Sequence, residues 1–165
     1  MGNSLNSNQA VVYARVSSKE QEQEGFSIPA QLKLLREEAR RKELPVTREF
    51  TDAETAKQAG RSGFTEMLEY LKDNPHVRYL LCEKTDRLLR NFWDIATLDD
   101  MMNQRGLVIV LVKENVELHR DSRSHEKFIF GIKALMAKNY IDNLSEEVRK
   151  GQGEKAAQGE YPSIA

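Results

Sequence analysis

The sequence predicts an α/β domain with a central, mainly parallel sheet of about four to five strands, flanked by helices on both faces. Two observations carry this prediction. Short apolar runs rich in β-branched residues, typical of buried strands, recur between residues 10 and 112. The segments between them repeat apolar residues every three or four positions, as helices packed on a core do. Strands and helices that alternate in this order form parallel sheets, because each helix crosses one face of the sheet.

The elements are predicted from local patterns. The run AVVYARV at residues 10–16 is apolar and β-branched, as in a buried strand. Ser27 is a helix cap and Pro29 stands in the first turn, so a helix is predicted from there to about Lys42. Gly106 closes a later helix. The remaining elements are a strand at 45–50, a polar loop at 51–63, a helix carrying Phe64, Met67, Leu68 and Leu71, a strand at 77–82, a helix at 91–105 and a strand at 107–112.

A different pattern covers residues 124–158. The segment holds no proline, and its apolar residues recur at helical spacing from Phe128 to Val148, which predicts a projecting helix of ~50 Å. Its apolar stripe needs a partner, most simply the same helix of a second subunit. The alternative is a helix that breaks near Gly151 or Gly153 and ends in a frayed tail.

Composition limits the classes of function. The net charge is −1, from 25 Lys and Arg against 26 Asp and Glu, whereas a self-sufficient nucleic-acid binder carries a basic balance. The single cysteine, Cys82, excludes an internal disulfide and a multi-cysteine zinc site. No run approaches the ~20 apolar residues of a membrane span, and residues 1–9 lack the apolar core of a signal peptide. We therefore expect a reducing, cytoplasmic location without membrane contact.

The candidate chemistry lies at the carboxyl ends of two predicted strands. Arg15 and Ser17 end the first strand, and Asp86, Arg87 and Arg90 follow the strand at 77–82. Ligands of open parallel sheets bind at this edge. Arg87 and Arg90 are predicted on one face at the start of a helix, where an anion balances their charge. A serine beside several arginines suits phosphoryl transfer, although each residue by itself is more simply a surface residue or a cap.

The motifs YARVS at residues 13–17 and DRLLR at 86–90 resemble the catalytic domain of the serine recombinase (resolvase/invertase) family. The resemblance continues at Gln21, at SIPAQ (27–31) and at FTD (50–52) with Arg61 and Gly63, and it covers roughly residues 11–159. The long segment from Glu20 to Phe26 is most like the large serine recombinases and integrases of phages and mobile elements. The acidic-arginine pair that many small members carry on the long helix is not evident at 139–147.

The resemblance implies a site-specific DNA recombinase. Ser17 would attack the scissile phosphate to form a 5′-phosphoserine link and a free 3′-hydroxyl, followed by strand exchange and religation without metal, cofactor or ATP. The other residues implied are Arg15, Arg87, Arg90 and Arg61 on the phosphate, Asp86 orienting an arginine or handling the proton of the 3′-oxygen, and Gln21 and Gln31 in positioning.

Double-stranded DNA is the implied partner, with self-association to a dimer, and to a tetramer on DNA, through the long helix. The resemblance implies a disordered tail at 1–9, a catalytic domain at 10–122, a dimerisation and DNA-contacting helix at 123–158, and at 159–165 the start of a linker to a missing DNA-binding domain.

Two other functions remain open from the residues alone. In a metal-dependent nuclease, Asp52, Glu54, Glu83 and Asp86 would gather around Mg²⁺. In a non-catalytic binding or dimerisation module, replacing Ser17 would change nothing measurable. No glycine-rich phosphate loop supports nucleotide binding. The histidines His76, His119 and His125 are scattered and expected at the surface.

Overall fold

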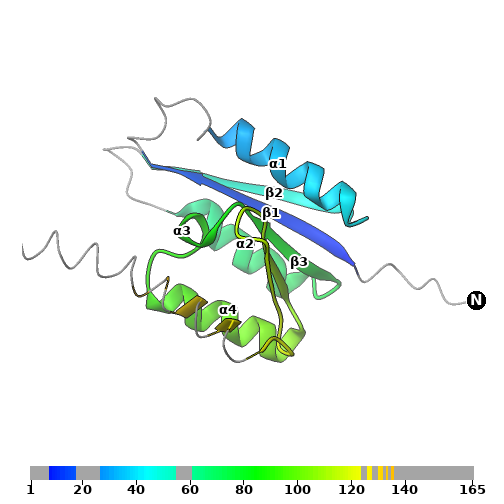
Figure 1. Ribbon diagram of the computed structural model, residues 1–165, viewed down its shortest axis with the longest axis vertical. Helices are drawn as coiled ribbons and strands as arrows, with labels where there is room; N and C mark the ends of the chain where they lie inside the picture. The colour runs from blue at the N-terminus through cyan, green and yellow to red at the C-terminus, as the bar shows by residue number, and fades with distance from the viewer. Residues whose placement is uncertain are drawn as a thin grey trace, which may run out of the picture.

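The computed structural model describes residues 8–17, 27–54 and 61–123, together with residues 126, 127, 130, 131, 133 and 135 (Figure 1). In these residues the predicted alternation of strands and helices is confirmed. The elements are β1 (Gln9–Val16), α1 (Ile28–Arg41), β2 (Val46–Ala53), α2 (Ser62–Asp73), β3 (Val77–Cys82), α3 (Thr85–Leu88), α4 (Phe92–Arg105), β4 (Val108–Leu111) and β5 (Val116–Leu118).

The five strands form one sheet in the order β2-β1-β3-β4-β5. The first four are parallel to their neighbours, and β5 returns antiparallel to β4. Chain order reverses beside β1, because β2 lies on one side of it and β3 on the other. Such a switch point leaves a crevice at the carboxyl ends of the strands, where ligands of open α/β sheets bind. The fold therefore predicts a ligand site at the carboxyl ends of β1 and β3.

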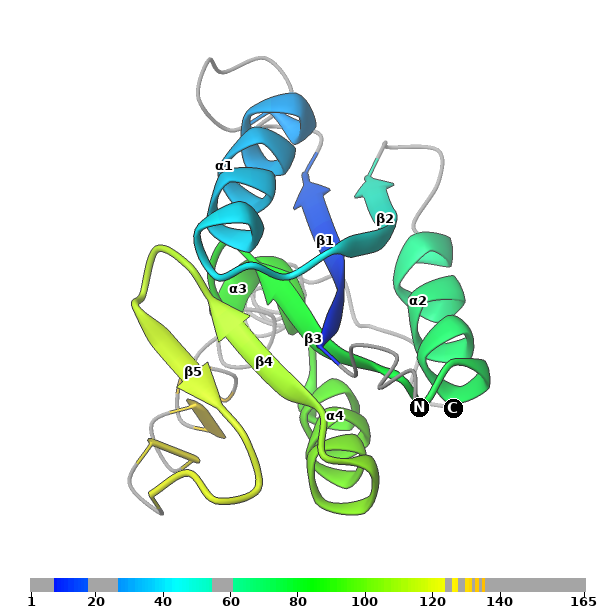
Figure 2. The ribbon, with the colours of Figure 1, turned by 90° about the vertical axis from the view of Figure 1, so that its right-hand side faces the viewer.

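Helices cover both faces of the sheet, as Figures 1 and 2 show. On one face, Leu35 and Ala39 of α1 pack against Ala10 and Val12 of β1. On the other face, α2 and α4 pack with Val11 and Tyr13 and the neighbouring strands. Residues 10–14 are fully buried. A strand covered on both faces needs apolar residues at every position, which explains its continuous apolar sequence.

Side-chain caps set the ends of the helices. The Ser27 hydroxyl accepts a hydrogen bond from the backbone N–H of Ala30 (3.2 Å), and Pro29 stands in the first turn of α1. Asn91 accepts from the backbone N–H of Asp94 (3.1 Å) and starts α4. Gly106 ends α4 with φ 70°, a left-handed conformation that a side chain disfavours. The caps predicted at Ser27 and Gly106 are thus confirmed.

Three local predictions differ from the structure. The strand predicted to end at Phe50 continues to Ala53, because β2 stays in register with β1 as far as the pair Val16 and Ala53. Sequence patterns also missed α3 and β5, whose lengths of 4 and 3 residues are too short for a periodic signal. The long helix predicted at 124–158 lies largely outside the described residues, so its length and the domain boundaries stay predictions.

Candidate active site

Ser17 directly follows β1 and is partly buried at the switch-point edge. The strand β1 is paired with β3 up to Tyr13 and Cys82, and α3 begins three residues after Cys82. The parallel register therefore places Ser17 on the same edge of the sheet as the segment 83–90. This is the juxtaposition that the motifs predicted.

Arg15 joins the end of β1 to α3. Its Nε donates to the carbonyl oxygen of Arg87 (3.1 Å), and its Nη2 donates to the carbonyl oxygen of Asp86. Its Nη1 lies 3.5 Å from Oε1 of Glu54. Burial lowers the pKa of Arg15, while Glu54 acts in the opposite direction. The guanidinium is thus held in place by main-chain carbonyls and balanced by one carboxylate.

Gln31 is fully buried and holds the main chain of Arg15. Its Oε1 accepts from the backbone N–H of Arg15 (3.1 Å), and its Nε2 donates to the Arg15 carbonyl oxygen (2.9 Å). The ladder between β1 and β3 stops at Tyr13, so the Gln31 amide takes the place of a strand partner beyond that point. These bonds hold the backbone two residues before Ser17.

Arg61 lies at the start of α2 and contacts the connection between α3 and α4. Its Nη2 donates to the carbonyl oxygen of Leu88 (2.6 Å), and its Nη1 pairs with Oδ2 of Asp94 (2.5 Å). The guanidinium also stacks on the ring of Phe64, 3.9 Å from its centroid. Arg61 therefore anchors the segment from which Arg90 projects.

The prediction that Arg87 and Arg90 share the face of one helix is wrong. Arg87 lies in α3 and is 3% exposed, with its Nε 3.9 Å from Oε1 of the equally buried Glu83. The chain leaves the helix at Leu89, whose backbone is extended and whose side chain is buried. Arg90 consequently lies between α3 and α4, with its side chain 34% exposed and its Nη1 2.8 Å from Oε1 of Glu54.

Asp86 reaches the site by its backbone rather than by its carboxylate. The carbonyl oxygen accepts from Arg15, whereas the side chain is exposed and lies 3.7 Å from Nζ of Lys84. Gln21 lies outside the described residues. The structure therefore brings together Ser17, Arg15, Gln31, Arg61, Arg90 and the main chain of Asp86 and Arg87.

Asp52 supports the site from the end of β2. Its carboxylate accepts from the Tyr13 hydroxyl (2.7 Å) and from the backbone N–H groups of Gly63 (2.8 Å) and Phe64 (2.9 Å). Burial raises the pKa of Tyr13, and the bond to Asp52 adds to this effect. A Cβ at Gly63 would lie 2.3 Å from the carbonyl oxygen of Thr51, so this close approach of α2 requires glycine. The sequence places Tyr13 in the YARVS motif but does not predict its bond to Asp52.

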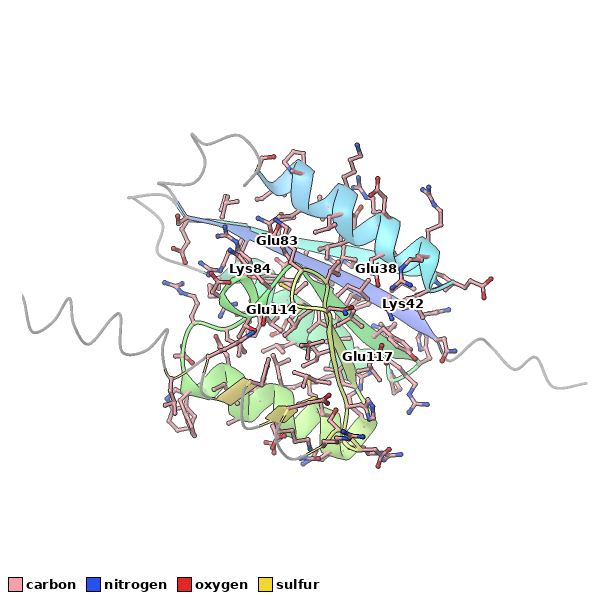
Figure 3. All side chains as sticks on the ribbon, in the orientation of Figure 1. Glu38, Lys42, Glu83, Lys84, Glu114 and Glu117 are labelled. Carbon is pink, nitrogen blue, oxygen red and sulfur yellow. The ribbon has the colours of Figure 1, made fainter. Side chains whose placement is uncertain are left out.

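Two glutamates contact the site although the resemblance gives them no role. Glu54, considered from the sequence only as a metal ligand, faces both Arg15 and Arg90. Glu114, labelled in Figure 3, lies in the turn between β4 and β5. It accepts from the backbone N–H (2.5 Å) and the hydroxyl (2.9 Å) of Thr85, the first residue of α3, and pairs with Lys133. Burial acts to raise the pKa of Glu114, but the bonds from Lys133 and Thr85 outweigh it and lower the pKa.

The four carboxylates considered for a metal site have separate partners. Asp52 holds the start of α2, Glu54 faces two arginines, Glu83 lies beside Arg87 and Lys113, and Asp86 is exposed near Lys84. Across residues 8–17, 27–54, 61–123 and the few described beyond them, no three His, Cys, Asp or Glu side chains are grouped to hold a metal ion. Cys82 is buried, which raises the pKa of its thiol to about 12.

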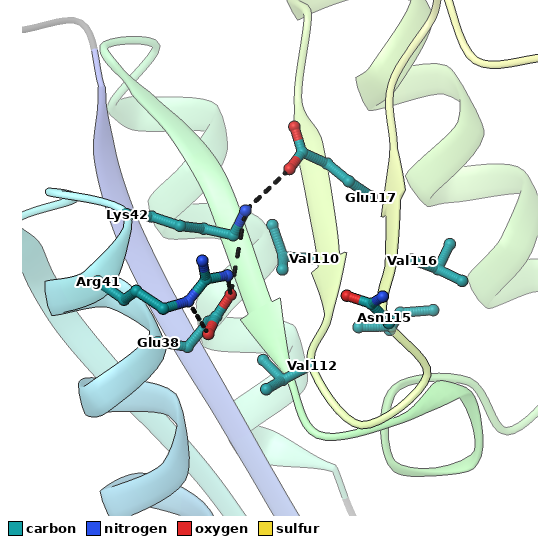
Figure 4. A pocket seen from close by; sticks show the side chains of 9 residues that line it. Glu38, Arg41, Lys42, Val110, Val112, Asn115, Val116 and Glu117 are labelled. Carbon is teal, nitrogen blue, oxygen red and sulfur yellow. Dashed lines mark hydrogen bonds and ion pairs between the residues drawn. The ribbon is translucent and has the colours of Figure 1, made fainter.

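Other features of the described residues lie outside this cluster. A pocket of about 80 Å³ between α1 and the β4–β5 hairpin is lined by none of the candidate residues; there Lys42 pairs with Glu117 at 3.2 Å and Glu38 at 3.9 Å (Figure 4). His76 is exposed, and His119 is partly exposed, whereas His125 is not among the described residues. None of the helices described has the length and apolar character needed to cross a membrane.

Comparison with solved structures gives matches along most of the chain. A resolvase family site-specific recombinase from Streptococcus pneumoniae has 23% sequence identity and a TM-score of 0.63, with 90% of this chain and 98% of that chain covered. The N-terminal catalytic domain of TP901-1 integrase has 21% identity and a TM-score of 0.58, covering 84% and 98%. The C-terminal catalytic domain of ISC1926 TnpA, an IS607-like serine recombinase, has 19% identity and a TM-score of 0.52, covering 85% and 98%.

At these identities the structural likeness shows the fold. Among curated proteins, none matches the chain. The family model described as Resolvase, N terminal domain matches residues 10–161, which is most of the chain. The family predicted from YARVS and DRLLR is therefore confirmed, and the chain belongs to the resolvase family of serine recombinase catalytic domains.

Proposed function

We propose that Ser17 is the nucleophile with which this recombinase catalytic domain breaks and rejoins DNA. One observation carries the proposal. The guanidinium groups of Arg15 and Arg90 converge on a single carboxylate oxygen of Glu54, at 3.5 and 2.8 Å, beside the strand end that bears Ser17. A non-bridging oxygen of a phosphodiester accepts the same guanidinium hydrogen bonds as this carboxylate oxygen, so the two arginines can bind it in the same way.

The reaction consists of two phosphoryl transfers. The Ser17 hydroxyl gives up its proton as its Oγ attacks phosphorus, the bond from phosphorus to the 3′-oxygen breaks, and the 3′-oxygen takes up one proton in exchange. The phosphate then joins Ser17 to the 5′ end of the DNA. After strand exchange, a 3′-hydroxyl attacks this phosphoserine and releases Ser17. Each step forms one phosphate ester as it breaks another, so no ATP is consumed, and guanidinium groups neutralise the charge that a metal otherwise balances.

Each remaining residue receives a role from its contacts. Arg15 and Arg90 bind the non-bridging oxygens of the phosphate. Arg61 holds the connection between α3 and α4, Arg87 lies buried beside Glu83, and both add positive potential. Gln31 is a positioning residue, because it holds the main chain of Arg15. The Asp86 carbonyl oxygen accepts from Arg15 and so orients this arginine. By resemblance alone, the exposed Asp86 carboxylate is assigned the proton of the 3′-oxygen and Gln21 is assigned to positioning.

The partner in this proposal is double-stranded DNA, and the compartment is the cytoplasm. Subunits pair through the segment that follows residue 123, as a dimer and then as a tetramer on DNA. The net charge of −1 gives the chain little general attraction for DNA. Sequence recognition is therefore assigned to a further DNA-binding domain, by resemblance to the large serine recombinases.

The test is a covalent-trapping experiment. A nicked DNA substrate, which prevents religation, is incubated with the protein fused to a DNA-binding module, in the presence of a metal chelator. Mass spectrometry then asks whether Ser17 carries a 5′-phosphate-linked oligonucleotide. We expect this adduct in the wild type and none with Ser17→Ala, while Ser122→Ala, in the turn that follows β5, leaves the adduct intact. Cleavage that requires Mg²⁺ and leaves no adduct would point to a nuclease instead.

A further inference from the structure

Glu54 lies where the phosphate-binding arginines meet. Its Oε1 is 2.8 Å from Nη1 of Arg90 and 3.5 Å from Nη1 of Arg15. Its backbone N–H donates to the carbonyl oxygen of Val16 (3.0 Å), the residue before Ser17. The carboxylate is thus an anion held beside Ser17 and shared by two arginines.

The other two arginines of the cluster have different acidic partners. Arg61 pairs with Asp94, whose side chain is 12% exposed, and Arg87 lies beside Glu83, which is 2% exposed. Glu54 is 21% exposed and stands just beyond the last residue of β2. Of these three acids, Glu54 is the one that an anion arriving from solvent can displace without disturbing the core.

We propose that Glu54 is an internal anion that occupies the phosphate position on Arg15 and Arg90 until the DNA phosphate displaces it. The inference rests on the proposed function, because that function places the scissile phosphate on these two arginines. A carboxylate and a phosphodiester accept the same guanidinium hydrogen bonds, so they compete for one position, and their negative charges repel. Glu54 keeps the two arginines together and neutralises part of their charge before DNA binds, and it weakens their affinity for any other anion.

The test compares two single-charge substitutions, one just beyond β2 and one within it. Glu54→Gln keeps the shape of the side chain and removes its charge. The matched control is Glu49→Gln, within β2, which removes one negative charge from a surface pair with Arg36 (2.8 Å). Inorganic phosphate is titrated into protein with ¹⁵N-labelled arginine at fixed ionic strength, and the Nε–H signals of Arg15 and Arg90 report binding.

We expect Glu54→Gln to lower the dissociation constant for phosphate at Arg15 and Arg90 by roughly fivefold, the upper end of what a partly exposed ion pair contributes. Glu49→Gln should match the wild type within a factor of about two. An equal effect of the two substitutions, or weaker binding with Glu54→Gln, would overturn the proposal.

A second variant keeps the proposal testable if Glu54→Gln fails to fold. Glu54→Asp retains the charge but withdraws the carboxylate by one methylene, so we expect a gain in phosphate affinity of roughly twofold. No gain with this variant refutes competition by Glu54. The Ser17 adduct is measured separately from these phosphate titrations, so the two results do not depend on each other. An adduct in the wild type with no effect at Glu54 therefore removes only this inference, whereas a missing adduct removes the proposed function.

Discussion

The end of β1 and the connection from α3 to α4 meet in one site, but they hold their residues by different means. At β1, the parallel ladder and the Gln31 amide hold the main chain of Arg15 by neutral hydrogen bonds. In the DRLLR segment, the side chains of Arg87, in α3, and of Arg90, in the connection to α4, lie beside the carboxylates of Glu83 and Glu54. The first half of the site therefore depends on backbone hydrogen bonds, and the second depends on charge pairs.

The sharpest test of this difference is within the DRLLR segment itself. Arg87→Ala breaks a buried pair and leaves the buried carboxylate of Glu83 with Lys113, 3.6 Å away, as a cationic partner; we expect a loss of about 3 kcal/mol in the free energy of unfolding. Arg90→Ala removes a partly exposed pair and should cost less than about 1 kcal/mol. Urea unfolding of both variants measures the two losses. Equal values would mean that Arg87 is not held mainly by its buried pair.

The β1 half is tested by removing its clamp. Gln31→Ala leaves the buried N–H and carbonyl groups of Arg15 without these hydrogen bonds, so we expect a loss of about 2 kcal/mol in the free energy of unfolding. Gln104→Ala on the exposed side of α4 is the matched control and should change it by less than about 0.5 kcal/mol. The loss with Gln31→Ala should be independent of salt. If the loss in the free energy of unfolding becomes smaller at high salt, ionic interactions also support this half of the site.

A smaller effect than at Arg87 or Gln31 is expected at Glu114, which links α3 to Lys133. Glu114→Gln should cost about 1 kcal/mol in the free energy of unfolding at pH 7, because a charge-assisted bond becomes a neutral one. The folded-state pKa of Glu114 lies below the ordinary value of 4.5. Its contribution is therefore complete above pH 4.5 and is lost as the pH falls through the folded-state pKa.

Chemical denaturation of wild type and Glu114→Gln between pH 7 and pH 3 checks this dependence. The difference between the two proteins should narrow toward the acid end. A difference that stays constant over this range would show that the Glu114 charge does not support α3. Glu117→Gln, on the exposed side of β5, serves as the control for removing one charge nearby.

Much of the fold was predictable from the sequence, because burial on both faces of a parallel sheet leaves a local signal. The fully apolar run at residues 10–14 predicts β1, and Ser27 and Gly106 predict two helix ends. The short elements α3 and β5 left no such signal. Missing α3 led directly to the wrong placement of Arg90, since the break at Leu89 depends on its burial in the core.

The sequence by itself determined that Ser17 follows β1 and that the segment 83–90 follows β3, and parallel topology then brought both to one edge. Only the tertiary structure decided which arginine is buried, which is exposed and which acid each one faces. The physical reason is the distance along the chain: Arg15 and Glu54 are 39 residues apart, and Thr85 and Glu114 are 29 apart. Contacts of this kind follow from how helices and strands pack, and no local pattern of residues encodes them.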